Sequence, residues 1–193
     1  MVLIRLAIED DSAGIADIYR LYVEDSRISF EEHAPDAAEM ARRIVGDRPG
    51  YHPWLVAEED GRVLGFANSS PLRTRPAYRW SVETGIYLAP DAHGRGLGKR
   101  LLSTLIELLE RQGYVTAIGA IALPNDASIR LHQALGFVPS GTYRGTGFKH
   151  GQWIDVGHWQ KELAPRSPAP AEPLPFEALF EPSASSPGSP RTA

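Results

Sequence analysis

The stretch IYLAPDAHGRGLGK, residues 86–99, joins a predicted β-strand to a predicted α-helix. The strand runs from Trp80 to Leu88, and leucines then recur at helical spacing until Gly113, which is placed to end the helix. A glycine-rich turn before a helix exposes backbone N–H groups without intrahelical partners, and the helix dipole adds positive potential there. The turn therefore predicts an anion site, although a tight turn that binds no ligand has the same glycine pattern.

The residues of this turn favour phosphate as the anion. Gly96 and Gly98 lack a Cβ atom and let the backbone approach phosphate oxygens, while Arg95 and Lys99 add positive charge. The spacing does not match a Walker loop, which needs four residues between its first glycine and its Gly-Lys-Ser/Thr ending. It does not match the dinucleotide fingerprint either, because the run follows the fourth predicted strand rather than the first. We therefore expect a different phosphate-bearing ligand.

Helical and strand patterns alternate on both sides of the turn. Acidic residues and a serine at positions 9–12 are suited to cap a first helix, Asp36 and Glu39 have capping-box spacing, and the turn from Glu59 to Arg62 indicates a hairpin. The order strand, two helices, three strands, helix, strand, helix, two strands predicts a mixed α/β (α+β) sheet with helices on its faces. The predicted strands are residues 3–7, 54–57, 63–67, 80–88, 115–122, a strand from 137 onward and 153–163, and the predicted helices start near residues 13, 36, 97 and 127.

Composition limits the class of protein. The 193 residues are 42% hydrophobic and 23% charged, which is typical of a soluble globular protein. A net charge of −4 gives no broad basic footprint for nucleic acid, and no stretch has the ~20 apolar residues of a membrane span or the core of a signal peptide. We expect a cytoplasmic protein with no nucleic-acid or membrane partner. The absence of cysteine excludes disulfides, thiolate metal sites and a cysteine nucleophile.

The chain changes character at Ala164. Eight of the sixteen prolines fall in residues 164–193, among Ser, Ala and Gly. We predict one domain over residues 1–163 and a disordered tail over 164–193, whose removal leaves activity intact. Within the tail, residues 174–180 (LPFEALF) are more apolar than a linker requires, so docking on this protein or on a partner is the alternative.

Several separated motifs give the chain a family resemblance. Residues 86–99, then Leu123-Pro124-Asn125, then residues 128–137 (SIRLHQALGF) resemble the GNAT N-acetyltransferases, in this order. Residues 80–83 (WSVE), His132 and residues 147–157 (GFKHGQWIDVG) are most similar to the phosphinothricin acetyltransferase branch. The resemblance covers roughly residues 3–163. It implies a mainly antiparallel twisted sheet of about seven strands with about four helices, acetyl-CoA as co-substrate, no metal, and a homodimer.

The resemblance also implies where the co-substrate binds. In the family the pyrophosphate lies on the amides of the glycine turn, and the pantetheine arm lies along the preceding strand. His93 departs from the Gln or Arg that usually opens the motif, which affects one side-chain contact at most because backbone amides carry most of the binding. The residues implied are Ile86, Tyr87, Leu88, His93, Gly94, Arg95, Gly96, Leu97, Gly98 and Lys99, with Asn125 and Ser128 from the other side.

N-acetylation needs a general base, because an ammonium group has no lone pair to attack the thioester. Glu83 lies on the strand that approaches the turn, and the resemblance places the catalytic glutamate of the branch there. Its alternative is an ordinary surface carboxylate. His132 stands where many relatives have a tyrosine that acts as general acid, and a histidine can move protons near pH 7. Its alternative is a structural role on a helix.

The acceptor side carries weaker signals. Phe30 and the arginines Arg73, Arg75 and Arg79 are predicted to frame a pocket that holds an acidic group, although a solvated basic loop explains the arginines equally well. Lys149, Trp153 and Asp155 belong to the motif of the branch and are predicted to shape the pocket wall, with plain hairpin and core roles as the alternative.

These signals together predict direct transfer of an acetyl group from acetyl-CoA to the amine of a small amino acid analogue such as phosphinothricin or methionine sulfoximine or sulfone. Without cysteine, an acetyl-cysteine intermediate cannot form. The alternatives are acetylation of a protein N-terminus, a lysine, a polyamine or an aminoglycoside, and a noncatalytic acyl-CoA-binding module.

Overall fold

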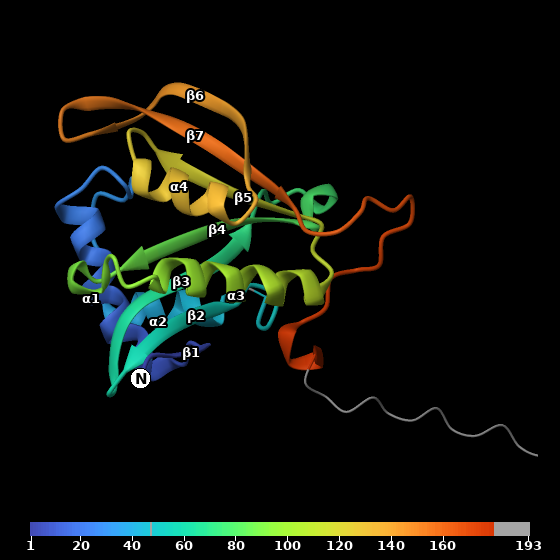
Figure 1. Ribbon diagram of the computed structural model, residues 1–193, viewed down its shortest axis with the longest axis horizontal. Coiled ribbons are helices and arrows are strands. Elements are labelled where there is room, and N and C mark those ends of the chain that lie inside the picture. The colour runs from blue at the N-terminus through green and yellow to red at the C-terminus, as the bar shows by residue number, and fades with distance from the viewer. Residues whose placement is uncertain (47, 180–193) are drawn as a thin grey trace, which may run out of the picture.

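The chain forms one seven-stranded sheet with helices on both faces, in a computed structural model that describes residues 1–46 and 48–179 (Figure 1). The predicted order of elements is confirmed, and boundaries differ by one to three residues at most ends. The strands are β1 (Leu3–Leu6), β2 (Trp54–Glu59), β3 (Arg62–Pro71), β4 (Ser81–Leu88), β5 (Thr116–Ala122), β6 (Val138–Lys149) and β7 (Gln152–Glu162). The helices are α1 (Ser12–Glu24), α2 (Ala37–Val45), α3 (Leu97–Gln112) and α4 (Asp126–Ala134).

The strands lie in the order β1-β2-β3-β4-β5-β7-β6. Every neighbouring pair is antiparallel except β4 and β5, which are parallel. A parallel pair needs a crossover, and α3 provides it between β4 and β5. The mixed, mainly antiparallel sheet expected from the sequence is therefore confirmed.

Alternation along the strands divides the core between the two faces. In β2, Leu55 and Ala57 face a cluster built on the leucines of α3, whereas Val56 faces a cluster built on α1. In β3, Ala67 and Phe66 divide in the same way. Successive strand residues point to opposite faces, so each strand contributes to both clusters. Helices therefore cover both faces of the sheet at β2 and β3.

Local signals explain most of the helix ends. The Asp36 carboxylate accepts a hydrogen bond from the Glu39 amide at 2.8 Å, as the capping-box spacing predicted. Gly113 ends α3 in the left-handed conformation at φ 92°. The cap expected for α1 differs, because the Asp11 carboxylate binds the Arg5 guanidinium at 2.6 and 2.8 Å and accepts from the Ile8 amide. Asp11 therefore ties β1 to the start of α1 rather than capping α1.

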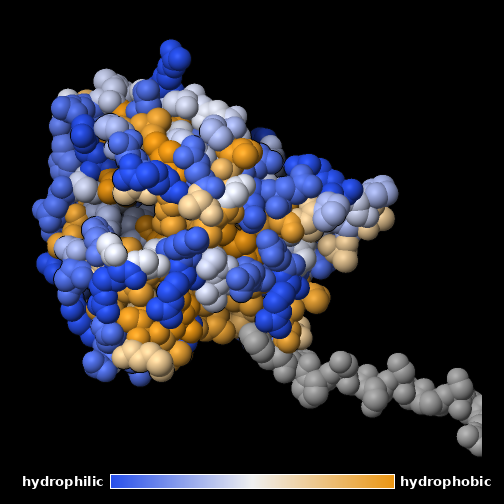
Figure 2. All heavy atoms as spheres, viewed as in Figure 1, coloured by the Kyte–Doolittle hydropathy of each residue, from blue (hydrophilic) through white to orange (hydrophobic). Residues whose placement is uncertain are grey.

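The C-terminal part of the described chain returns to the sheet. Residues 164–170 project from the body, and the following residues lie against the end of α3 (Figure 1 and Figure 2). Pro173 is buried, and Phe176 and Leu179 pack against the core cluster of α3. The expected disorder therefore does not hold for residues 171–179, where packing agrees with the docking alternative. Residues 180–193 of the predicted tail lie outside the described residues, and the domain boundary at residue 163 stays a prediction.

A search of the helices in the described part of the chain finds none with the length and apolar character that crossing a membrane requires.

Candidate active site

The sheet opens in its middle, between β4 and β5. The two strands pair only from Ser81–Thr84 to Thr116–Gly119, and β5 continues to Ala122 paired with β7 alone. On the other side of β4, the Ala89 amide donates to the Leu64 carbonyl of β3 at 2.9 Å. Backbone groups alternate in direction along an antiparallel strand, so those of Ile86 and Leu88 face the opening. β4 thus offers a strand edge to a ligand that can pair with it.

Tyr22 of α1 occupies part of this edge. Its hydroxyl donates to the Leu88 carbonyl at 2.7 Å and accepts from the Leu88 amide at 3.2 Å, while His93 Nε2 lies 3.3 Å away. Burial raises the pKa of the Tyr22 hydroxyl, which keeps it protonated and able to donate. Among the described residues, the Ile86 amide has no such partner, so it remains the backbone donor that faces the opening.

The glycine turn lies at the end of the same edge. Gly94 and Gly96 have φ of 74° and 73°, in the left-handed region that favours glycine, and no described atom lies within 4 Å of where their Cβ atoms would be. α3 begins at Leu97, so the first amides of the helix point into this open space. Lys99 is exposed, and Arg95 forms an ion pair with Glu59 at 2.8 Å. The turn therefore fits a diphosphate held mainly by backbone amides.

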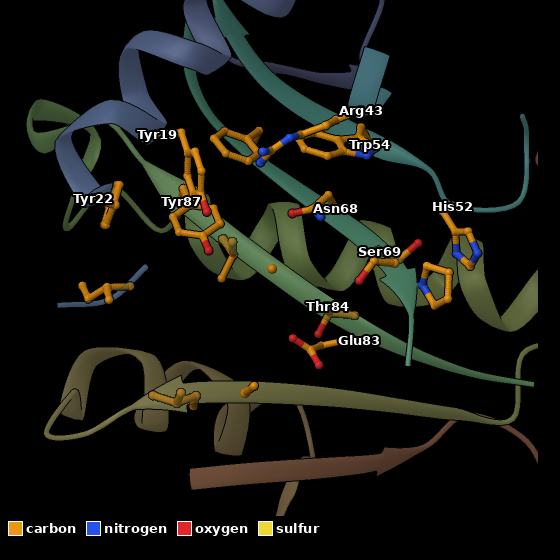
Figure 3. Close-up of a pocket in the computed structure, with 18 of the residues that line it drawn as sticks. Tyr19, Tyr22, Arg43, His52, Trp54, Asn68, Ser69, Glu83, Thr84 and Tyr87 are labelled. Atoms are coloured by element: carbon orange, nitrogen blue, oxygen red, sulfur yellow. The ribbon is translucent and has the colours of Figure 1, made fainter. Parts of the chain in front are cut away.

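One cavity of about 1400 Å³ connects the turn with the opening and with the loops beyond β3 and β4 (Figure 3). It brings together twelve of the twenty-one residues assigned from the sequence. Those lining it are Arg73, Arg75, Arg79, Glu83, Ile86, Tyr87, Leu88, His93, Gly94, Asn125, Ser128 and His132. Those outside its lining are Phe30, Arg95, Gly96, Leu97, Gly98, Lys99, Lys149, Trp153 and Asp155, whose carboxylate accepts from the Gly145 amide at 2.7 Å.

Glu83 lies on β4 opposite Ser70 of β3, at the deep end of the opening. Figure 3 shows its carboxylate in the space between β4 and β5. Within residues 1–46 and 48–179 it forms no hydrogen bond and no ion pair. A partly buried carboxylate without a partner that lines a cavity is available to accept a proton from a bound molecule.

His132 lies on α4 across the opening, with 3% of its surface exposed. Its Nδ1 lies 2.8 Å from the Ser128 carbonyl oxygen, which can only accept, so Nδ1 carries the proton. Nε2 is buried without a described partner and abuts Gly119 of β5, where a Cβ atom would collide with the ring. Burial lowers the pKa of His132, despite the opposing hydrogen bond to Ser128. The imidazole is therefore neutral near pH 7, with a lone pair on Nε2.

Asn125 has a structural function besides its place at the cavity. Its side-chain oxygen accepts from the Ser128 amide at 3.1 Å and caps α4. This cap fixes the first turn of α4, which contains Ser128. His132 lies one helical turn further along the same helix, so the cap also helps to position its ring.

The three predicted arginines differ in how much of their charge is free. Arg79 donates through Nε to both carboxylate oxygens of Glu172, at 2.8 and 2.9 Å, and stacks on Trp80. Arg73 donates to the neighbouring Leu72 carbonyl at 2.6 Å, and the Arg75 side chain has no hydrogen bond or ion pair in the described chain. Arg73 and Arg75 are therefore the arginines of this loop whose charge is free for an acidic ligand.

Phe30, Lys149 and Trp153 do not take the position in the pocket wall that the sequence suggested. Lys149 is buried, and its ammonium group donates to the carbonyls of Val23 and Ser29 at 2.5 and 2.6 Å. The Phe30 ring covers Gly147, where a Cβ atom would collide with it. Trp153 is 70% exposed beside Phe148. Lys149 and Phe30 thus hold the loop after α1 against β6, and Trp153 lies on the outer surface.

The structure adds cavity residues that the sequence did not indicate. Asn68 of β3 lies over Gly85 of β4, where an added Cβ atom would collide with the Asn68 side chain. The Ser69 hydroxyl and His52 Nδ1 are buried at the cavity without partners among the described atoms. Isolated polar residues in a strand or loop carry no periodic signal, so nothing in the sequence singled them out.

The environment of His52 leads us to expect that the folded state loses stability in acid. Burial, with a smaller contribution from Arg48, lowers its pKa to about 4. The folded protein then binds fewer protons than the unfolded chain below about pH 6.5, so stability falls as the pH drops from about 6.5 to about 4. Between pH 7 and 5, we expect the free energy of unfolding of His52→Gln to fall by about 1–2 kcal/mol less than that of the wild type. Urea denaturation at both pH values measures this, and equal losses would contradict it.

The free edge and the turn together define the class of protein. A strand edge that continues into a diphosphate-sized turn suits a long co-substrate whose far end is phosphorylated, and coenzyme A has this form. The fold and the site therefore define a coenzyme A-dependent transferase.

Comparison with known proteins gives the family. Residues 15–137 match the model of the acetyltransferase (GNAT) family, and the chain belongs to that family. It is 40% identical over 172 residues to the phosphinothricin N-acetyltransferase of Streptomyces viridochromogenes, covering 89% of this chain and 93% of the relative. It is 34% identical over 165 residues to the L-methionine sulfoximine/L-methionine sulfone acetyltransferase of Salmonella typhimurium, covering 83% and 94%.

A solved structure supports the same family assignment as these two relatives. The phosphinothricin acetyltransferase of Sinorhizobium meliloti in complex with AcCoA superposes with a TM-score of 0.80 at 40% identity, covering 83% of this chain and 88% of that one. The protein is accordingly an acetyl-CoA-dependent N-acetyltransferase. Because these relatives are named as enzymes, a noncatalytic acyl-CoA-binding module is not favoured.

Proposed function

We propose that the acceptor is the α-amine of a small, polar amino acid analogue, of the kind that phosphinothricin, methionine sulfoximine and methionine sulfone represent. The observation that carries the proposal is the unpaired Glu83 carboxylate in the same cavity as Arg73 and Arg75. A base beside the free strand edge can accept a proton from the amine, and the two guanidinium groups can bind a carboxylate or phosphinate. The names of the relatives support the same class of acceptor.

In the proposed reaction, Glu83 accepts a proton from the amine, directly or through one water, and frees the lone pair that attacks the thioester. The co-substrate supplies an activated acetyl carbonyl. The C–N bond forms as the C–S bond breaks, and the thiolate that leaves takes up a proton. The Leu88 amide is bonded to Tyr22, so the Ile86 amide is the donor of this edge that would polarise the thioester carbonyl as its oxygen gains charge.

His132 contributes as an acceptor in this scheme. With its proton on Nδ1, the neutral ring has a lone pair on Nε2 for the second proton, which the N-protonated tetrahedral intermediate must lose. Because Nε2 is buried against Gly119 of β5, this proton reaches it through a water rather than by direct contact. A general acid would instead need the imidazolium before the reaction starts, and the lowered pKa keeps the resting ring neutral, so any proton on Nε2 is held only transiently.

Acetylation of phosphinothricin and methionine sulfone, followed as thiol release from acetyl-CoA, tests the acceptor. Comparison amines are a polyamine, an aminoglycoside and a peptide with a free N-terminus. We expect kcat/KM for the small acids to exceed that of each comparison amine. Higher activity on the peptide or the polyamine would overturn the proposed acceptor while leaving the family unaffected.

We also propose a homodimer formed through the outer surface of β6 and β7. The exposed aromatic residues Tyr143, Phe148 and Trp153 lie there, 55%, 59% and 70% exposed, and β6 is an edge strand. Such a cluster is typical of an interface. We expect sedimentation at micromolar concentration to give a dimer, and Trp153→Glu to shift it to the monomer without a change in circular dichroism. A wild-type monomer under these conditions would contradict the dimer.

A further inference from the structure

The C-terminal strap, residues 171–179, contacts the arginine loop of the cavity. The Trp80 indole N–H donates to the Ala171 carbonyl at 2.8 Å, and Glu172 forms the ion pair with Arg79. Trp80 and Arg79 are the last residues of the loop between β3 and β4, which also carries Arg73 and Arg75. The loop is thus anchored at its β4 end by two consecutive residues of the strap.

The same strap joins a second loop of the cavity to the end of α3. The Leu174 amide donates to the Gln112 carbonyl at 2.8 Å, and the Gln112 side-chain amide donates to the Leu174 and Gly50 carbonyls at 2.8 and 3.0 Å. The Phe176 amide donates to the Gly50 carbonyl at 2.8 Å. A Cβ atom at Gly50 would collide with Glu177 and Pro175, which shows how closely the strap packs there. Backbone pairing and close packing of this kind fix one chain segment against another.

Both anchored loops line the cavity at the end away from the glycine turn. Arg48 and His52 come from the loop before β2, and Tyr114, just after α3, lines the cavity beside His52. By contrast, the hydrogen bonds and ion pairs of the strap reach neither residues 93–99 nor the Ile86–Leu88 edge. The strap therefore supports the acceptor end of the cavity and leaves the co-substrate end to the sheet and α3.

We propose that the strap is a structural part of the acceptor site, and that Glu172 and the Ala171 carbonyl position the loop that presents Arg73 and Arg75. This rests on the proposed function for the identity of the acceptor. Glu172 also neutralises Arg79, which leaves the two other arginines of the loop to bind the acid. Acceptor affinity depends on the strap in this arrangement, whereas acetyl-CoA affinity does not.

Two truncated chains test the proposal. A chain ending at Pro170 lacks the strap, and a control chain ending at Leu179 keeps it and loses only residues 180–193. We expect the chain ending at Pro170 to raise KM for the acceptor about tenfold, because small displacements of positioning groups have large effects, with the Kd for coenzyme A unchanged. The control should match the full chain in both constants. An unchanged acceptor KM in the shorter chain, or equal losses on both sides of the site, overturns the proposal.

Glu172→Gln provides the test that does not depend on truncation. It removes the ion pair with Arg79 and keeps the backbone contacts of the strap, so we expect a rise of about threefold in acceptor KM, typical of an exposed ion pair. Glu162→Gln, which removes an exposed ion pair with Arg166 outside the cavity lining, is the matched control. If Glu172→Gln leaves the acceptor KM unchanged while the Pro170 chain fails to fold, the proposal is wrong.

Trypsin gives a readout that needs no acceptor. Removal of the strap should speed cleavage after Arg73 and Arg79 several-fold, mapped by mass spectrometry, because the loop opens more often. Faster cleavage together with turnover of none of the small acids would refute the proposed acceptor and retain the anchoring of the loop. Unchanged cleavage would refute the anchoring itself.

Discussion

Glu83→Gln is expected to lower kcat by about 10²–10⁴-fold while leaving the Kd for coenzyme A unchanged. Glutamine keeps the size of the side chain on β4 but cannot accept the proton of the amine. Because no described hydrogen bond or ion pair depends on the carboxylate, the change should leave stability near that of the wild type. Thiol release measures kcat, and calorimetric titration with coenzyme A measures the Kd.

The pH dependence separates a base from a group that only binds the acceptor. As the pH rises from 7 to 9, a growing fraction of the free amine has already lost its proton, so the defect of Glu83→Gln should shrink. Glu107→Gln, which changes an exposed carboxylate on α3, is the control and should match the wild type. A defect of constant size across this range would remove Glu83 from the role of base.

Gly96→Val is expected to weaken coenzyme A binding by about 10–100-fold, or roughly 1.4–2.7 kcal/mol. The left-handed conformation costs an L-residue about 1–2 kcal/mol, and a β-branched residue avoids it strongly. The turn at φ 73° should therefore relax and carry the amides at the start of α3 away from the diphosphate. Calorimetric titration with coenzyme A measures the loss.

Gly151→Val separates this effect from strain alone. Gly151 has the same φ of 73° and the same open surroundings, but it lies in the turn between β6 and β7, outside the cavity. Both variants should unfold at similarly reduced temperatures, and only Gly96→Val should lose affinity. Equal affinities in the two variants would mean that the glycine turn does not hold the co-substrate.

The order of the elements was predictable because its signals are local. The apolar period of α3, the turn at Glu59–Arg62 and the Asp36 cap each act within a few residues, and the structure contains all of them. The function of Asp11 was not predictable, because its partner Arg5 lies on another element and competes for the same carboxylate. The strap was misjudged for a similar reason, since proline-rich composition does not show that a few residues are complementary to Gln112 and Gly50.

In the site, too, the features with local sequence signals were predictable, and those that depend on contacts between distant residues were not. The glycine turn and Glu83 could be located from motifs, and the cavity includes Glu83 and the start of the turn. The free charge of Arg75, the paired state of Arg79 and the tautomer of His132 depend on contacts across the fold. Lys149 shows the limit most clearly, because a lysine in a family-like motif was expected at the pocket and instead joins α1 to its own loop.

The opening between β4 and β5 also leaves the two halves of the sheet joined by few backbone pairs. Four parallel residue pairs connect the β1–β4 half to the β5–β7 half, whereas β5 and β7 share seven pairs within their half. A ligand that pairs with the free edge of β4 and also contacts α4 bridges the two halves, and the free energy of binding then opposes their separation. A co-substrate bound along this edge would extend the backbone pairing of the sheet as well as supply the acetyl group.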